Sequence, residues 1–235
     1  MGSIRLELVS ELYAGFDAPI TALDCGDKCA PYNQHGVPFC CDSQQVVPTA
    51  YDSEWIYLQE NSDLWHLWQG ESAAETAELM QATPSGQVLI ECKGHQHCQR
   101  DYRSFTCRAF PFFPYLNSMG EFIGISYYAE YAAQCWLISN LPRVERSYLN
   151  QFVQTYEWIF DLAPAEKENF FIHSAHVRET FAKKRRQVVV ISRNGEFWKI
   201  RPTNESVTRI NPAKLSKLGP YRIAARLPFP GEDVD

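Results

Sequence analysis

The clearest hydrophobic pattern lies in the second half of the chain. Apolar residues recur every three or four positions from Val144 to Phe160, which is the spacing of one buried helix face. Pro142 suits the first turn of this helix, which must end before Pro164. A second helix is expected from Ala165 to about Arg185. The pattern thus predicts two consecutive helices separated by a proline.

Strand patterns are shorter and are bounded by turn residues. A β-hairpin is expected around Asn194-Gly195, because both residues tolerate the positive φ of a two-residue turn. The run Gln87 to Glu91 predicts a strand that delivers Cys92 at its end. Phe122 to Tyr128 is a further strand candidate. The predicted strands of the hairpin are Val188 to Arg193 and Glu196 to Arg201.

The first 82 residues have a weaker pattern. Ile4, Leu6 and Leu8 alternate with polar positions, which predicts a short strand. Glycine, proline and cysteine then dominate as far as Pro48, so that segment is expected to be loop. From Thr49 to Ala82 the composition favours helices, divided near Gly70.

Helices and strands mix without regular alternation, which predicts an α+β fold rather than a doubly wound sheet. The expected architecture is a loop-rich cysteine-cluster core with amphipathic helices and a C-terminal β-hairpin. We divide it into a metal-binding domain, residues 1–162, and an extension packed on it, residues 163–235.

The chain has 235 residues, of which 45% are hydrophobic, enough to form a sizeable core. It contains no run of 18 apolar residues, and its first 20 residues lack the pattern of a secretory signal, so we expect a cytoplasmic protein without a membrane span. In a reducing compartment, eight cysteines favour metal ligands or redox groups over disulfides.

The charge is unevenly distributed. Residues 1–100 carry 4 basic and 14 acidic groups, a net charge of −10, whereas residues 101–235 carry 18 and 14, a net charge of +4. The dense basic run Lys183 to Arg186 is typical of a solvated helix end. Because phosphate binding needs a basic footprint, no nucleic-acid partner is expected.

The cysteines form two clusters separated by about fifty residues. The spacing is Cys-x3-Cys-x10-Cys-Cys, followed by Cys-x5-Cys-x8-Cys, with one further cysteine downstream. Neighbouring thiolates repel unless a cation neutralises them, so the clustering predicts a metal centre. The candidate ligands are Cys25, Cys29, Cys40, Cys41, Cys92, Cys98, Cys107 and Cys135.

Eight thiols exceed one tetrahedral site, which takes four ligands. Either one centre leaves spare thiols, or two metals share the region. Thiolate ligands suit zinc and iron-sulfur clusters alike, and the excess of cysteine favours a 4Fe–4S cluster. His35, His95 and His97 could add imidazole ligands, and Cys135 could equally belong to the apolar core.

These residues resemble those of the YkgJ-like cysteine-cluster family, whose members are considered zinc- or iron-chelating proteins. The resemblance rests on Cys25-x3-Cys29, the pair Cys40-Cys41, and Cys107-Arg108-x-Phe110-Pro111, and it covers roughly residues 20–140. It implies a metal-binding protein, with an iron-sulfur cluster in some members. The flagellin lysine N-methylase is distantly similar.

The resulting hypothesis is a cytoplasmic metal-binding protein that holds an iron-sulfur cluster or zinc. The alternative is a methylase-like or redox enzyme that modifies protein side chains with S-adenosylmethionine or an iron-sulfur cofactor. No glycine-rich loop follows a predicted strand to place such a nucleotide. A third hypothesis is an interaction protein whose hairpin, Gln187 to Arg201, binds a protein partner.

Several residues have two interpretations each. Arg108 either contacts the cofactor, neutralising cluster sulfurs, or forms a surface ion pair. The segment Phe110 to Pro114 is expected to form an apolar wall beside the centre. Cys25 and Cys29 could instead be a redox pair without metal. His173 and His176 have the spacing of a helical metal pair or of ordinary core histidines.

Overall fold

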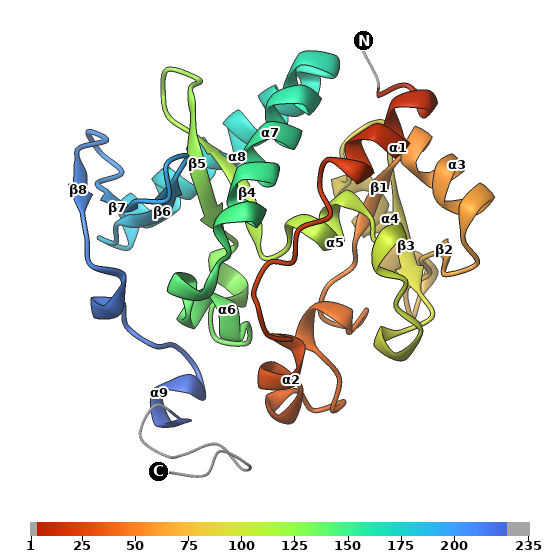
Figure 1. Cartoon of the computed structure of the whole chain (residues 1–235), viewed down its shortest axis with the longest axis horizontal. Coiled ribbons are helices and arrows are strands. Elements are labelled where there is room, and N and C mark those ends of the chain that lie inside the picture. Colours follow the sequence, from red (N-terminus) through yellow and green to blue (C-terminus); the bar gives the residue numbers. More distant parts are fainter. Residues whose placement is uncertain (1–3, 225–235) are drawn as a thin grey trace.

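The protein has an α+β fold built around two antiparallel sheets, as seen in a computed structural model that describes residues 4–224 (Figure 1). A smaller sheet with helices α1, α3 and α4 lies on the right of the view. The larger sheet lies on the left with helices α7 and α8, and the short helix α5 lies between the two halves.

The smaller sheet has three strands in the order β1-β3-β2. Strand β3 (Gln87–Cys92) is central and pairs with β1 (Thr49–Tyr51) and β2 (Trp65–Leu67). Helix α3 (Asp52–Asn61) follows β1 directly and packs against α1 (Leu6–Ala14). Helix α4 (Ala73–Ala82) starts at Ser72, whose side chain accepts a hydrogen bond from the Glu75 amide.

The larger sheet has five strands in the sequential order β4-β5-β6-β7-β8. Its strands are β4 (Phe112–Leu116), β5 (Phe122–Tyr127), β6 (Val188–Ser192), β7 (Phe197–Ile200) and β8 (Val207–Arg209). Strands β4 and β6 are buried along their whole length. Since β5 pairs with β6, the sheet joins residues from both sides of the expected domain boundary at residue 162.

Helices α7 (Arg146–Leu162) and α8 (Pro164–Lys183) follow one another and pack together. Helix α7 also contacts β5, and α8 contacts β4 and β6, so the pair covers the larger sheet (Figure 1). Pro164 occupies the first turn of α8, where its missing N–H is not needed. Four shorter helices complete the fold: α2 (Gly26–Cys29), α5 (Phe105–Ala109), α6 (Trp136–Ser139) and α9 (Tyr221–Ala224).

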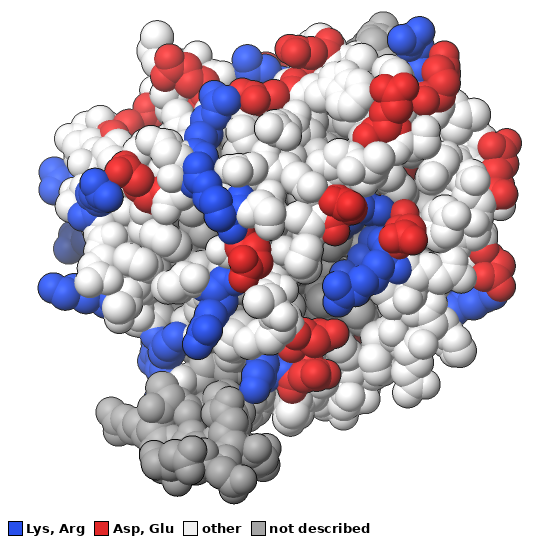
Figure 2. Space-filling view, in the orientation of Figure 1, with Lys and Arg blue, Asp and Glu red and all other residues white. Residues whose placement is uncertain are grey.

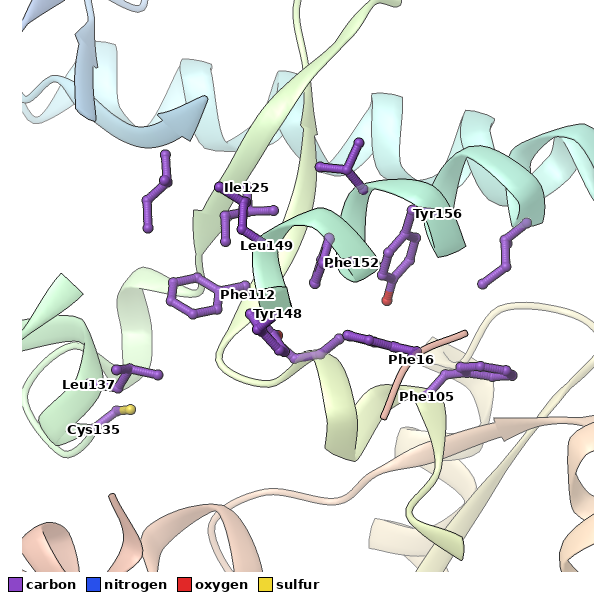
Figure 3. Close-up of a cluster of buried hydrophobic side chains, with 14 of the residues drawn as sticks. Phe16, Phe105, Phe112, Ile125, Cys135, Leu137, Tyr148, Leu149, Phe152 and Tyr156 are labelled. Atoms are coloured by element: carbon purple, nitrogen blue, oxygen red, sulfur yellow. The ribbon is translucent and has the colours of Figure 1, made fainter. Parts of the chain in front are cut away.

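The main core lies where α7 meets α1, α5 and the larger sheet. Phe152 is fully buried and stacks on Tyr156 with ring centroids 4.5 Å apart. Figure 3 shows Phe16, Phe112 and Tyr148 gathered at the same place, with Cys135 and Leu137 at one end. The aromatic packing therefore extends from α7 to Cys135.

Most of the predicted elements are present. The hairpin forms at Asn194-Gly195, β3 ends at Cys92, and the two consecutive helices occur at 146–162 and 164–183. Pro142 lies in a short 3-10 turn rather than in the first turn of α7. The segment 110–114 is apolar and largely buried, with Phe110 and Pro111 beside the cysteines, as expected.

Two expectations for the first 82 residues were wrong. The alternating Ile4, Leu6 and Leu8 do not form a strand, because Val9, Leu12 and Tyr13 give residues 6–14 a buried helical face. Between Thr49 and Ala82, the expected helices are interrupted by strands β1 and β2, since their backbones pair with β3. Tertiary pairing overrides local helix propensity here.

No helix within residues 4–224 is long and apolar enough to cross a membrane. Acidic and basic side chains are interspersed on the face of the molecule shown in Figure 2.

Candidate metal centre

All eight cysteines are free thiols carried by loops and element ends. Cys25 and Cys29 flank or end the short helix α2, and Cys40 and Cys41 end a 3-10 turn. Cys92 ends β3, and Cys107 lies in α5. Cys98 follows a 3-10 turn, and Cys135 directly precedes α6. Positions from residue 25 to residue 135 are thus brought into one region.

One set of thiols surrounds a small cavity of about 30 Å³. Its cysteines are Cys25, Cys29, Cys40 and Cys135, and the remaining lining is mostly apolar, including Phe39, Phe110 and Trp136. The Cys29 sulfur accepts a hydrogen bond of 3.4 Å from the Phe39 amide. Gly26 permits the close approach of α2 to Pro38, because a Cβ there would lie 2.9 Å from the proline ring. We call these four cysteines the first set.

The other thiols lie around Arg103, on the side of the smaller sheet. The Arg103 Nε donates a hydrogen bond of 3.1 Å to the Cys98 sulfur. The guanidinium charge also acts on the thiols of Cys107 and Cys41. Cys92 in turn has Cys41 and Cys98 as electrostatic neighbours. We call Cys41, Cys92, Cys98 and Cys107 the second set.

Two adjacent residues join the sets. The Cys40 and Cys41 thiols hydrogen-bond to each other. Cys40 has the first-set thiols Cys25 and Cys135 as its other thiol neighbours, whereas Cys41 adjoins Cys92 and Cys107. Cys29 also adjoins Cys41, so the sets touch along this line. The eight thiols therefore lie in one connected region, with four of them around the cavity.

Burial keeps most of these thiols protonated. It raises the pKa of Cys25 to about 11 and the pKa values of Cys107 and Cys135 to about 12. The pKa of Cys41 is lowered instead, chiefly by its hydrogen bond with Cys40. Buried neutral thiols are poor nucleophiles. A cation that replaces their protons would supply the charge that burial otherwise disfavours.

The arginine that contacts a thiol is Arg103 rather than Arg108. The Arg108 guanidinium donates hydrogen bonds to backbone carbonyls, among them Arg103 O at 2.8 Å and Asp101 O at 2.7 Å. It also stacks on the Tyr13 ring at 4.3 Å. Cofactor contact was expected of Arg108 because it follows Cys107, but successive helical residues point about 100° apart. Arg108 instead holds the loop that presents Arg103.

A sequence signal for Arg103 existed. It lies between Cys98 and Cys107, inside the second cysteine cluster, and it is half-buried. An arginine that lies between two cysteines in the sequence is close enough along the chain for its guanidinium to approach either thiol. Sequence reasoning had favoured Arg108 for its adjacency to one cysteine.

The histidine candidates lie in varied surroundings. His35 pairs with Asp42 at 2.7 Å. His95 and His97 lie in a 3-10 turn between Cys92 and Cys98. His173 is enclosed by aromatic rings, with Phe113 at 4.5 Å, and its Nε2 is buried without a hydrogen-bond partner; His176, on the same helix, is exposed. His35 and His173 thus have Asp42 and aromatic rings as partners rather than cysteine sulfurs.

A C-terminal segment packs beside the first set. The Tyr221 hydroxyl donates to the Gln134 carbonyl at 2.6 Å, next to Cys135 in sequence. Its pKa is raised by burial and by the neighbouring thiols Cys29, Cys135 and Cys25. The Leu218 amide and the Lys217 ammonium bond to Ser139, which lies in α6, at 2.9 and 2.8 Å. We call residues 217–221 the strap.

The donor chemistry fits a thiophilic metal. Each set offers four sulfurs, the number that tetrahedral zinc and a 4Fe–4S cluster both require. Among the side chains of residues 4–224, no three His, Cys, Asp or Glu groups already stand as a metal-coordinating group. Loading either set would therefore involve local movement of the ligand loops.

An open groove of about 540 Å³ lies at the edge of β2. Trp55, Trp65 and Leu67 contribute apolar surface to it, and His66 and Glu91 form an ion pair of 3.3 Å. Trp65 pairs with Cys92 across the sheet, so the groove lies near the second set.

Comparison of the chain with protein families, with curated proteins and with solved structures gave no match.

Proposed function

We propose that this protein binds metal through its clustered cysteines, as an iron-sulfur cluster or as zinc, in a reducing cytoplasmic compartment. The observation that carries the proposal is the gathering of eight free thiols from 25 to 135 in one region of the fold. Thiolates this close together would repel one another and destabilise the fold. A bound cation neutralises their charge and removes that repulsion.

The environment of the thiols supports a buried metal centre over a redox pair. Burial raises the pKa of Cys25 to about 11, whereas an exchanging thiol needs a lowered pKa. Arg103 donates to the Cys98 sulfur, as groups around metal thiolates commonly do. The apolar residues Phe110 and Pro111 lie beside the first set, where they limit access of water.

The proposal extends to a relationship with the YkgJ-like cysteine-cluster family, whose cysteine pattern the chain resembles, although its first cluster is longer by ten residues between Cys29 and Cys40. In that family, too, the expected role is chelation of zinc or iron by clustered cysteines. The chain's metal would be structural in part, because it would connect ligand loops that come from separate segments of the chain.

The test is the removal of single ligands. Cys25→Ser and Cys107→Ser should each lower the metal content of the purified protein and reduce the free energy of unfolding by several kcal/mol. Metal content is measured by elemental analysis and stability by thermal unfolding. Ser43→Ala, two residues after Cys41 and with no sulfur, is the matched control and should retain both. Full metal content in both cysteine variants would contradict the proposal.

A further inference from the structure

The number of thiols and their grouping raise the question of how many centres the chain holds. One tetrahedral metal or one 4Fe–4S cluster needs four protein sulfurs, and the structure gathers eight. If a single centre were present, four thiols would remain buried beside it without a cation. The arrangement of the two sets bears directly on this point.

The first set is a closed group. Cys25, Cys29, Cys40 and Cys135 line one cavity together, although they come from three separate segments of the chain. The Cys29 sulfur is held by the Phe39 amide at 3.4 Å. Mostly apolar side chains make up the rest of the lining, so a metal here would be shielded from water.

The second set differs in its surroundings. None of its cysteines lines the cavity of the first set. The Cys98 sulfur accepts a hydrogen bond from Arg103 at 3.1 Å, and the Cys107 thiol has Cys41 and Cys92 as electrostatic neighbours. Arg103 is not part of the lining of that cavity, although its charge also acts on the Cys25 thiol of the first set. Three of these sulfurs, those of Cys92, Cys98 and Cys107, are positioned by β3, α5 and the loop between them, and the fourth, that of Cys41, comes from the 3-10 turn Phe39–Cys41.

Cys40 and Cys41 divide the sulfurs between the sets. They lie in a 3-10 turn, Phe39–Cys41, in which successive side chains point about 120° apart. Cys40 lines the cavity and Cys41 does not. One backbone turn thus directs one thiol to each set.

We propose that the chain holds two separate four-thiolate centres, one formed by Cys25, Cys29, Cys40 and Cys135 and the other by Cys41, Cys92, Cys98 and Cys107. This inference rests on the proposed metal-binding function and specifies its stoichiometry and ligands. It applies to zinc and to iron-sulfur clusters alike, because both take four thiolates.

The decisive experiment compares Cys40→Ser with Cys41→Ser in the full chain. The two substitutions are chemically identical and adjacent, so general damage to the loop would affect both proteins alike. Each variant should retain about half of the wild-type metal, since each removes a ligand from one centre. Elemental and sulfide analysis gives the amount, and the absorption or cobalt-substituted spectrum identifies which centre remains.

A second pair of variants, at cysteines outside the 39–41 turn, tests whether misfolding of that turn causes the loss of metal. Cys135→Ser should match Cys40→Ser, and Cys98→Ser should match Cys41→Ser, in both metal content and spectrum. The double variant Cys40→Ser with Cys98→Ser should lose both centres. Equal losses with the same residual spectrum in Cys40→Ser and Cys41→Ser would overturn the division, as would complete loss or full retention in both.

The outcomes separate this inference from the proposed function. A wild-type protein that binds no metal would refute both. A wild-type protein that binds metal at one centre only, with variants that do not form two complementary pairs, would refute the two-centre arrangement and leave the metal-binding function intact.

Discussion

At the scale of single residues, the most consequential buried group outside the cysteines is Glu54. It is 1% exposed and accepts hydrogen bonds from the Tyr13 hydroxyl at 2.7 Å and the Phe105 amide at 2.6 Å. It also accepts from the Tyr51 amide at 3.1 Å. Burial outweighs these bonds and raises its pKa to about 7. This carboxyl ties α1, α3 and α5 together.

Glu54 should make stability depend on pH. Its folded-state pKa, about 7, lies above the ordinary value of 4.5. The folded chain therefore keeps a proton that the unfolded chain releases, and the free energy of unfolding falls as pH rises from about 4.5 through about 7. The contribution is about 3 kcal/mol, at 1.4 kcal/mol per pKa unit.

Glu54→Gln tests this contribution, because glutamine does not ionise. Its amide cannot accept all three hydrogen bonds, so the variant should be less stable than wild type near pH 5. The difference in the free energy of unfolding should narrow toward pH 8, as measured by urea denaturation across that range. Curves that stay parallel would show that Glu54 does not titrate in this window.

The two arginines of the 103–108 segment show what sequence can and cannot predict about single residues. The presence of a cation beside the thiols was expected from the sequence. Which arginine contacts a thiol was not predicted from the sequence. The answer depends on the backbone direction after Cys98 and on the backbone carbonyls that accept hydrogen bonds from Arg108. Tertiary structure decides whether each arginine donates to a cysteine sulfur or to backbone carbonyls.

At the scale of elements, the strap 217–221 is the contact most open to test. Gly219 has φ +53, and a Cβ there would lie 2.0 Å from the Ala133 carbonyl oxygen. The carbonyl belongs to the backbone and the position of a Cβ is fixed by the backbone, so no side-chain rotation can relieve this overlap. Only glycine lets the strap approach the segment that leads into Cys135 this closely.

Gly219→Ala should displace the strap and expose the first set of cysteines. We expect a chelator to remove metal from that centre at least several-fold faster than from wild type, because the local opening that admits it becomes less costly. The measurement is metal release followed by a colorimetric indicator. Gly120→Ala, also at positive φ but with open space around its Cβ, is the control. Equal metal-release rates in the two variants would show that the strap does not limit access to the first set of cysteines.

Element types with a strong local pattern could be predicted from the sequence. The helices at 146–162 and 164–183 and the Asn194-Gly195 hairpin have periodicity and turn residues that favour one conformation. Residues 6–14 do have a helical face, formed by Val9, Leu12 and Tyr13, which the alternation of Ile4, Leu6 and Leu8 obscures. The short strands β1 and β2 have no such pattern. Their structure depends on packing against α3 and on pairing with β3, which local sequence does not encode.

At the scale of the whole molecule, the fold brings distant cysteines together. Cys92 ends β3 of the smaller sheet, Cys107 lies in α5, Cys135 precedes α6, and the first four cysteines lie in the N-terminal segment 25–41. The sequence predicted the clustering of thiols near one another in the chain. It left open whether one or two centres form, and it did not predict which thiols line the cavity, because that depends on how the segment 25–41 packs against Cys135 and Phe110.

The central claim is that this gathering of thiols holds metal. The most direct measurement is iron, zinc and acid-labile sulfide analysis, with an absorption spectrum, on protein purified without oxygen. The account predicts either a brown protein with iron and sulfide in similar amounts or a colourless one with stoichiometric zinc. Protein that is folded, fully reduced and free of both metals, and that takes up neither when they are supplied, would contradict it.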